Sequence, residues 1–333
     1  MTMKKVSMSM TGAAVLVAAV AVLSFWVAPS RADTAWLEAR IANPKLRCRA
    51  SDRFTIIVHG GAFWGDPPGT TRRTVLRDVA VQAARWLDGG APALAVVEEA
   101  VAMLEDSGAF NAGKGANANA KGVVELDAGI MDGRTRRAGA VAAVRSLKNP
   151  VRAARLVMTW TPHVMLSGVS ADEALSELGA ETVDTGYFER TGNGEAFEEK
   201  GTVGAVALDR CGDLAAATST GGFGAKLPGR IGDSPIPGAG LFAENGLVAI
   251  AATGHGESFL QTVLSHEVAA RMRYGGETLD AAVRGAILET LASVGGEGGL
   301  VAVDAAGNAV SLFNSDGMLS EMMSSASLTD PDK

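Results

Sequence analysis

The 333-residue sequence predicts an α+β fold, in which antiparallel sheets pack against helices that are grouped between sets of strands. Two observations support this fold class. First, short apolar runs typical of buried strands are joined in pairs by turn sequences, namely DRCGD and DAAGN. Second, helical periodicity gathers between these sets of strands and does not alternate with single strands, which disfavours a doubly wound parallel sheet.

Eight runs are predicted to be strands, because they are short, apolar and bounded by turn-forming residues. They are FTIIV (54–58), GVVEL (122–126), AGAVAAV (138–144), VGAVAL (203–208), LAAATS (214–219), LVAIAA (247–252), GLVAV (299–303) and AVSLF (309–313). The turn sequences predict two hairpins, one formed by the fourth and fifth runs and one by the last two.

Five segments have the apolar spacing of a helix, and Ser170 and Glu173 have the spacing of a capping box. The helical segments are 93–108, 149–158, 170–179, 257–275 and 277–291. Between the two halves of the chain, residues 179–201 combine charge, Gly and Thr without a sustained apolar period. This composition indicates an exposed linker of the kind that tolerates chain cleavage.

The N-terminal residues have the pattern of a secretory signal peptide. Lys4 and Lys5 precede an apolar run over about 12–28, and Ser30 and Ala32 follow it at small-residue cleavage positions. An uncleaved membrane anchor is the alternative, but it needs roughly 20 apolar residues. We therefore expect residues 1–32 to be removed near Ala32, and the mature protein to be periplasmic or secreted, with no stable membrane partner.

Composition narrows the class of protein further. With 47% hydrophobic and 20% charged residues, a mainly disordered chain is excluded. Signal removal takes away Lys4, Lys5 and Arg31 but no acidic residue, so the net charge of −7 becomes −10. Such a charge disfavours nucleic acid as a partner. An oxidising compartment would permit a disulfide between Cys48 and Cys211, although two separate thiols are equally compatible with the sequence.

Some motifs suggest other chemistries and are incomplete. The segment HGGAFW (59–64) is similar to the oxyanion loop of lipase-type α/β-hydrolases, but the sequence contains no G-x-S-x-G elbow. His266 and Glu267 begin a zinc motif in which Ala270 replaces the second histidine. With four histidines and two distant cysteines, a transition-metal centre is disfavoured.

The segment EEKGTVGAVALD places Thr202 between Gly201 and a predicted strand. Thr202 could simply begin that strand. If the chain is cut before it, however, its new α-amine, with an ordinary pKa of about 7.7 to 8.0, can take the proton of its own hydroxyl. Gly201 suits such a cut, because glycine reaches backbone conformations closed to other residues.

Four segments decide between these two interpretations: GTVGAVALDRCGDLAAATSTGG, GRIGDSPIPGAG, TGHGE and NAGKGA with the following ELDAGIMDG. In order and spacing they resemble the plant-type L-asparaginase and isoaspartyl peptidase family of N-terminal-threonine hydrolases, over about Phe54 to Met318. The resemblance implies a four-layer αββα sandwich of the N-terminal nucleophile type. It also implies self-cleavage between Gly201 and Thr202 into an α subunit (33–201) and a β subunit (202–333), which assemble as αβ and then as (αβ)2.

The resemblance further implies roles for individual residues. Matched positions give a catalytic set of Thr202, Thr220, Thr253 and Gly254, and a substrate-binding set of Arg230, Ile231, Gly232, Asp233, Thr253, Gly254, His255 and Gly256. An arginine fork suits the substrate α-carboxylate and an aspartate suits its α-ammonium. Asn111 is matched to a supporting residue from the other half of the chain, and the segment from about Leu104 to Ala116 to a loop whose backbone carbonyls wrap a sodium ion. No organic cofactor is implied.

The function expected from the resemblance is hydrolysis of the side-chain amide of L-asparagine or of a β-aspartyl peptide. Glycosylasparaginase activity is an alternative within the same fold, although GTVGAV differs from the DTIGMV type. An uncleaved aspartate-binding protein and an esterase built on HGGAFW are alternatives from other classes. The sequence also departs from the family in its short linker and in Ser315, where many relatives have threonine.

Overall fold

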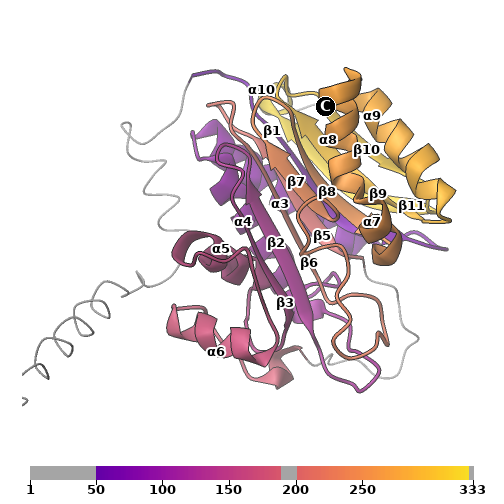
Figure 1. The fold of residues 1–333 in the computed structure, drawn as a ribbon. Helices are drawn as coiled ribbons and strands as arrows, with labels where there is room; N and C mark the ends of the chain where they lie inside the picture. Colours follow the sequence, from indigo (N-terminus) through magenta and orange to yellow (C-terminus); the bar gives the residue numbers. More distant parts are fainter. Residues whose placement is uncertain (1–49, 189–200, 330–333) are drawn as a thin grey trace, which may run out of the picture.

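The computed structural model describes residues 50–188 and 201–329. Two β-sheets pack face to face, and helices cover the outer face of each (Figure 1). The predicted α+β class is therefore confirmed. In the described part of the chain, no helix is both long and apolar enough to cross a membrane; the predicted signal peptide and Cys48 lie outside the described residues.

The larger sheet has seven strands, in the order β11-β1-β5-β6-β2-β3-β4. Their bounds are β11 Gly317–Ser324, β1 Thr55–Phe63, β5 Val203–Leu208, β6 Leu214–Thr220, β2 Leu126–Asp132, β3 Ala138–Val144 and β4 Met165–Ser167. All neighbours are antiparallel except β3 and β4. Strands from before and after residue 202 are interleaved, because β1 lies between β11 and β5.

The smaller sheet has four strands in the order β10-β9-β8-β7, all antiparallel. Their bounds are β10 Ala309–Phe313, β9 Gly298–Asp304, β8 Val248–Gly254 and β7 Leu241–Glu244. Both predicted hairpins are confirmed, as β5 pairs with β6 and β9 with β10. The apolar residues form two core clusters, one under the helices of the larger sheet and one that continues between the sheets to the helices of the smaller sheet.

Helices α3 (Thr70–Asp88), α4 (Ala93–Ser107) and α5 (Pro150–Trp160) cover the larger sheet, and α8 (Leu264–Gly275) and α9 (Leu279–Gly285) cover the smaller one. The shorter helical segments are α6 Val169–Glu177, α7 Gly256–Thr262, α10 Ser325–Thr329, a π-helical stretch Ala286–Leu291 and 3₁₀ turns at Gly113–Gly115 and Thr185–Phe188. α9 begins after Thr278, whose hydroxyl accepts a hydrogen bond from the Ala281 amide. The predicted helix at 277–291 therefore exists, with a π-helical second half.

Several predicted elements are corrected by the structure. The predicted strand 122–126 is largely wrong, because the Asn119 side chain accepts from the amides of Lys121 and Val123 and folds the start of this segment into a turn, after which Val124 makes only an isolated bridge to Ala118. The β2 ladder begins only at Leu126. The predicted capping box at Ser170 is also wrong: α6 already begins at Val169, so Ser170 lies inside the first turn, where it makes no cap hydrogen bond.

The predicted helix 257–275 is two helices, since Val263 takes a left-handed conformation with φ of 48°. Beyond this break, the amide of His266 donates to the Gly238 carbonyl and the hydroxyl of Ser265 to the Ala239 carbonyl. These contacts turn α8 toward the loop that follows Asp233. Because of this change in direction, α7 lies beside the cavity described below, whereas α8 covers the smaller sheet.

The predicted exposed linker 179–201 is structured in its first part. Thr182 bridges to Leu147, and Phe188 is almost completely buried in the first core cluster. The burial of Phe188 contradicts the expectation of an exposed loop at that position, whereas residues 184–186 are exposed as predicted, and 189–200 lie outside the described residues. Cys211 is not a free thiol.

Candidate active site

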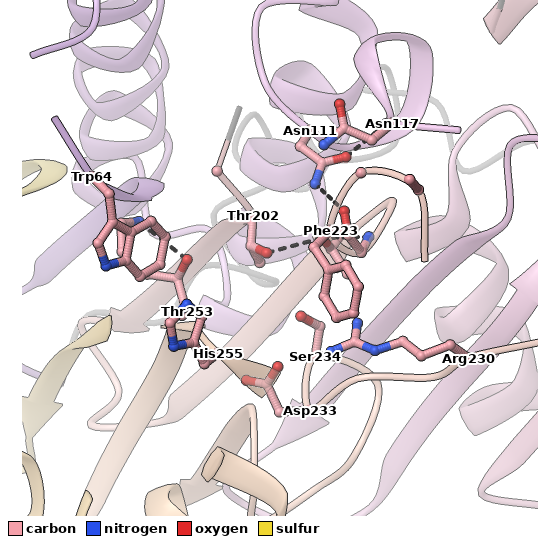
Figure 2. A pocket seen from close by; sticks show the side chains of 17 residues that line it. Trp64, Asn111, Asn117, Thr202, Phe223, Arg230, Asp233, Ser234, Thr253 and His255 are labelled. Carbon is pink, nitrogen blue, oxygen red and sulfur yellow. Dashed lines mark hydrogen bonds between the residues drawn. The ribbon is translucent and has the colours of Figure 1, made fainter. Parts of the chain in front are cut away.

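A cavity of about 490 Å³ opens where β5, β6 and β8 meet the loops that follow β1 and β6. Figure 2 shows the residues that line it. Thr202, Thr220 and Thr253 all contribute to its wall, together with Arg230 and Asp233. The structure thus brings together side chains from segments that are far apart in the sequence.

Thr202 lies directly before β5, near the middle of the larger sheet. Its hydroxyl donates a hydrogen bond of 2.9 Å to the hydroxyl oxygen of Thr220, at the end of β6. Thr220 in turn accepts a hydrogen bond of 3.0 Å from the amide of Gly222. The buried Thr220 therefore fixes the orientation of the Thr202 hydroxyl from one side of the cavity.

The peptide unit before Thr202 is tightly enclosed. The amide of Asn111 donates to the Gly201 carbonyl oxygen at 3.0 Å. Gly61, with φ of 98°, packs on the other side, where a Cβ atom would stand 2.2 Å from the Gly201 Cα and 2.9 Å from the Thr202 nitrogen. Only glycine fits at position 61, for both its conformation and its contact.

His59 lies behind this peptide unit and is completely buried. Burial lowers the pKa of His59 to about 3, and the nearby Thr202 backbone opposes the shift only weakly. The imidazole is consequently neutral at ordinary pH. Its ring fills the space beside Gly204, where a Cβ atom would stand 2.3 Å from the His59 Nε2 atom.

Thr253 is the last residue but one of β8 and also lines the cavity. Its hydroxyl oxygen accepts a 3.2 Å hydrogen bond from the Ala62 amide, which leaves the hydroxyl hydrogen free to donate elsewhere. The following Gly254 has φ of 151° and packs closely against Glu297 and Gly298. Thr253 and Gly254 are therefore held by backbone contacts from β1 and β9.

Arg230 reaches the cavity from the loop after β6. Its Nε and Nη2 atoms donate to the two carboxylate oxygens of Glu257 at 2.9 and 2.7 Å, and its guanidinium lies 4.3 Å from the ring centre of Phe223. These hydrogen bonds from Arg230 hold the pKa of Glu257 below its ordinary value. Because Nη1 takes no part in the pairing with Glu257, it remains as a donor for a ligand carboxylate.

Asp233 is the second charged group of this wall and is 5% exposed. Its Oδ2 atom has no hydrogen-bond partner among the described residues. Burial raises the pKa of Asp233 to about 7, against the opposing effects of its own backbone hydrogen bond and the Arg230 charge. A buried carboxylate with an open oxygen suits a cationic ligand group.

The predicted substrate-binding set divides into two parts. Arg230, Asp233, Thr253, Gly254 and His255 line the cavity, whereas Ile231, Gly232 and Gly256 do not. The last two lie behind the charged groups: a Cβ atom at Gly232 would stand 2.7 Å from Arg230 Nη1, and one at Gly256 would stand 2.8 Å from Asp233 Oδ1. These glycines make room for the side chains of Arg230 and Asp233.

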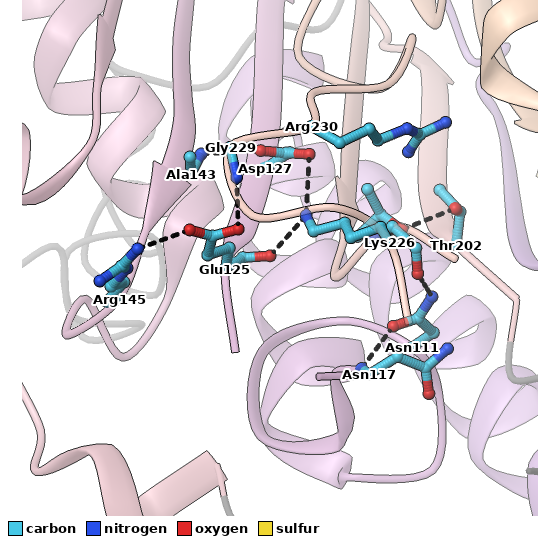
Figure 3. A network of polar contacts seen from close by, with 12 residues as sticks. Asn111, Asn117, Glu125, Asp127, Ala143, Arg145, Thr202, Lys226, Gly229 and Arg230 are labelled. Atoms are coloured by element: carbon cyan, nitrogen blue, oxygen red, sulfur yellow. Dashed lines mark hydrogen bonds and ion pairs between the residues drawn. The ribbon is translucent and has the colours of Figure 1, made fainter. Parts of the chain in front are cut away.

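Asn111, predicted as a supporting residue, lies next to the cavity and joins the two halves of the chain. Its side chain donates to the Gly222 carbonyl at 2.5 Å and accepts from the Asn117 amide at 2.8 Å, while its backbone carbonyl accepts from the Gly221 amide. Figure 3 shows these side-chain contacts beside Thr202. Asn111 therefore ties the loop after β6 to the segment before β2.

Lys226 also anchors the loop after β6, and the sequence did not predict this role. Its completely buried ammonium donates to the Glu125 carbonyl at 3.0 Å and lies 3.7 Å from the buried Asp127 carboxylate (Figure 3). Burial lowers the pKa of Lys226 and raises that of Asp127, and each charge opposes the shift of the other. The Glu125 carboxylate accepts from the amide of Gly229, directly before Arg230.

Other residues of the site were missed because their sequence context gives weak signals. They are Trp64, Asn117, Phe223, Ser234 and Glu257. Trp64 ends the HGGAFW segment that follows the predicted strand 54–58, and Glu257 ends the TGHGE segment, so the only available signal was membership of a recognised segment. Their contacts depend on the tertiary fold.

The segment expected to wrap a sodium ion has converging backbone carbonyls. A Cβ atom at Gly115 would stand 2.3 Å from the Phe110 oxygen and 2.5 Å from the Gly108 oxygen. Gly108 and Gly113 have positive φ values of 66° and 50°, which curl the backbone. Carbonyl oxygens are hard donors that suit such a cation. Within the described ranges, no three His, Cys, Asp or Glu side chains are grouped to hold a metal.

The sequence is similar to known proteins over most of its length. It is 43% identical over 290 residues to an isoaspartyl peptidase of Escherichia coli K12, covering 79% of this chain and 90% of that protein. It is 38% identical over 311 residues to an isoaspartyl peptidase/L-asparaginase of Rattus norvegicus, covering 88% and 92%, respectively. It is also 41% identical over 286 residues to a plant-type L-asparaginase of Pyrobaculum calidifontis, covering 79% and 95%.

The family comparison agrees with the resemblance found in the motifs around the cavity. A family model described as asparaginase matches residues 52–200 and 189–330, which together span both halves of the chain. The chain belongs to this asparaginase family.

Proposed function

We propose that this protein is an autoprocessed amidohydrolase of the N-terminal nucleophile type, with the four-layer αββα architecture, that hydrolyses β-aspartyl peptides and L-asparagine. The observation that carries the proposal is that Arg230 and the buried, open carboxylate of Asp233 both line the cavity that contains Thr202. These two groups match the α-carboxylate and the α-ammonium of an aspartyl unit. The names of the family relatives agree with this substrate class.

Chain cleavage is the first step. The Thr202 hydroxyl attacks the carbonyl carbon of Gly201, its proton passes to the peptide nitrogen, and the C–N bond breaks, which gives the free Thr202 amine and an ester between the two residues. The Asn111 amide donates to the oxygen of that carbonyl, where negative charge develops. Water then hydrolyses the ester, which releases the Gly201 carboxylate and leaves Thr202 with a free α-amine.

Substrate binding follows from the charged wall. Arg230 receives the α-carboxylate through the edge that Glu257 leaves open, and Asp233 receives the α-ammonium. With the two α-substituents fixed, the substrate's side-chain carbonyl is directed toward the Thr202 hydroxyl. Holding both reactants in one geometry removes much of the entropic cost of their encounter.

In the chemical step, the Thr202 amine takes the hydroxyl proton and the oxygen attacks the side-chain carbonyl carbon. The resulting oxyanion accepts hydrogen bonds from the Thr253 hydroxyl and the Gly254 amide. The amine returns its proton to the leaving nitrogen, and ammonia or an amino acid departs. Water, deprotonated by the same amine, then hydrolyses the β-aspartyl ester to release aspartate.

We further propose that the protein binds a sodium ion, assembles from two kinds of subunit and is exported. The carbonyls of Gly108 and Phe110 would hold a sodium ion, which would supply rigidity to the loop that carries Asn111. The α subunit 33–201 and the β subunit 202–333 would remain together and pair as (αβ)2. Export to the periplasm or the medium rests on the N-terminal sequence pattern.

The deciding experiment is intact mass measurement and N-terminal sequencing of purified, aged protein, beside a Thr202→Ala variant. We expect the wild type to yield a second chain that begins Thr-Val-Gly-Ala, and the variant to remain whole. The processed protein should hydrolyse β-aspartyl dipeptides and L-asparagine. If wild type and variant both remain single chains and neither substrate is hydrolysed, the protein is an aspartate-binding protein instead. Hydrolysis confined to a sugar-linked asparagine would identify a glycosylasparaginase.

A further inference from the structure

Two aromatic side chains form a stacked pair in the cavity wall and have no part in the chemistry above. The rings of Trp64 and His255 are nearly parallel, with an interplanar angle of 4° and a centroid separation of 4.8 Å. Both residues line the same cavity as Thr202 (Figure 2). A pair of planar faces at this position offers a wall of fixed shape.

Glu297 holds both members of the pair. Its carboxylate accepts a 2.7 Å hydrogen bond from the indole Nε1 of Trp64, and its backbone carbonyl accepts a 2.9 Å hydrogen bond from the His255 amide. Trp64 directly follows β1, His255 directly follows β8, and Glu297 directly precedes β9. Because the rings are already oriented, a ligand that packs on them loses little additional freedom in the protein.

The position of the pair relative to the reaction defines what it can contact. Trp64 lies two positions after Ala62, whose amide donates a hydrogen bond to the Thr253 hydroxyl oxygen. His255 directly follows Gly254. In Figure 2, Trp64 and Arg230 lie on opposite sides of Thr202. With the α-carbon end of the substrate at Arg230, the group attached to the attacked carbonyl extends toward the other side.

We propose that Trp64 and His255 form the subsite for the leaving amino acid, and that the preferred substrates are β-aspartyl dipeptides whose second residue is aromatic. This proposal rests on the proposed function and names its substrate class. A planar side chain would pack on the stacked pair, as aromatic groups do at ring separations of roughly 4.5 to 7 Å. Free asparagine, with only ammonia to leave, gains nothing from this wall.

The charge of the subsite adds a second preference. The Glu297 carboxylate lies at the edge of the pair through its bond to Trp64. A second residue with an acidic side chain would meet this like charge, whereas an aromatic one would not. We therefore expect β-aspartyl-phenylalanine to be hydrolysed more efficiently than β-aspartyl-glutamate.

The test compares kcat/KM for β-aspartyl-phenylalanine and L-asparagine in wild type and in Trp64→Ala, each normalised to the amount of chain that begins at Thr202. We expect the ratio of the two values to fall about tenfold in the variant, since an aromatic pair contributes up to roughly that factor. Phe223→Ala is the matched control, because Phe223 is also an aromatic residue of this cavity but contacts Arg230, which both substrates use. It should lower both values by a similar factor.

The outcomes separate this proposal from the proposed function. If Trp64→Ala lowers both substrates equally, or if the wild type hydrolyses asparagine but does not prefer β-aspartyl-phenylalanine over β-aspartyl-glutamate, the subsite is refuted while the hydrolase remains. If the wild type hydrolyses neither class, the proposed function itself fails. Should Trp64→Ala not accumulate as processed enzyme, His255→Ala removes the other ring without a change in β1 and must shift the same ratio.

Discussion

The backbone amide of Asn111 and the carbonyl oxygen of Gly201 are joined by a 3.0 Å hydrogen bond, although 90 positions separate the two residues in the chain. The donor points at the oxygen of the peptide bond that the proposed cleavage breaks. On its other side, the same peptide unit meets the backbone of Gly61. Asn111 and Gly61 thus enclose the peptide bond that precedes Thr202.

Gly61→Ala should slow chain cleavage by more than tenfold. The new Cβ atom would stand 2.2 Å from the Gly201 Cα, and the positive φ at this position is unfavourable for alanine, so the peptide unit must move away from Asn111. The fraction of cleaved chain over time, measured by intact mass, checks this. Gly65→Ala is the control, since Gly65 also has a positive φ but a Cβ atom there would have no neighbour within 4 Å. Equal cleavage rates in the two variants would contradict a role of Gly61 in holding the peptide unit before Thr202.

Thr220→Val should lower kcat by about 5- to 150-fold, which corresponds to the loss of a hydrogen bond of roughly 1 to 3 kcal/mol from the Thr202 hydroxyl. The methyl group of valine cannot accept the hydrogen bond from the Thr202 hydroxyl. Thr220→Ser restores the acceptor and should recover most of the activity. Steady-state kinetics with L-asparagine provides the measurement, and a Thr220→Val enzyme within twofold of wild type would contradict the assigned role.

The affinity for L-aspartate, the proposed product, should weaken as the pH falls below about 7. In the protein without ligand, burial raises the pKa of Asp233 to about 7. Below that pH its carboxyl group is mostly protonated and must release a proton before it can pair with an ammonium. The apparent affinity therefore falls by about tenfold per pH unit in this range, and protons are released on binding.

Isothermal titration calorimetry at pH 6, in two buffers of different ionisation enthalpy, measures that proton release. Asp233→Asn should bind L-aspartate weakly and without the proton release, because its amide does not titrate. A wild-type affinity that stays constant between pH 5 and 7 would show that Asp233 is already ionised there, or does not meet the ammonium.

Lys226→Met should lower the free energy of unfolding by about 3 to 5 kcal/mol, because it leaves the buried Asp127 without its counter-charge. Thermal unfolding in the single-chain Thr202→Ala background checks the expected decrease, on the order of 10 °C. The double variant Lys226→Met with Asp127→Asn should recover at least half of it. Lys148→Met is the control, since the Lys148 to Glu181 pair is exposed and contributes about 1 kcal/mol or less. Similar losses in both lysine variants would disprove a special role for the buried pair.

Much of the fold follows from patterns that need only local sequence. The runs 138–144, 203–208 and 309–313 are strands with the predicted bounds, because their short apolar sequences have the pattern of a buried strand. Several elements were not predicted, and the two longest of them are α3 and β11. β11 contains polar and charged residues among its eight, and α3 buries mainly alanine, valine and leucine beneath a polar exterior. In both, packing against the sheet determines the structure more than the local pattern.

The candidate site divides in the same way. Thr202, Thr220, Arg230, Asp233 and Thr253 were predicted because each belongs to a recognisable motif, and the structure places all of them around one cavity. The contacts that position them depend on distant segments. Trp64 and Glu297 are 233 positions apart, and Lys226 meets Glu125 across 101 positions. A single sequence contains no local signal for such pairs.

The interleaved order of the larger sheet has a consequence for the stability of the molecule after the proposed cleavage. β1, from the first half, is hydrogen-bonded on one side to β5 and on the other to β11, both from the second half. Neither fragment could close this sheet alone, so each would expose strand edges prone to aggregation. Once cut, the protein that unfolds must find a second polypeptide in order to refold, and recovery from heat or denaturant becomes dependent on protein concentration. The lifetime of the cleaved protein is then determined by its rate of unfolding.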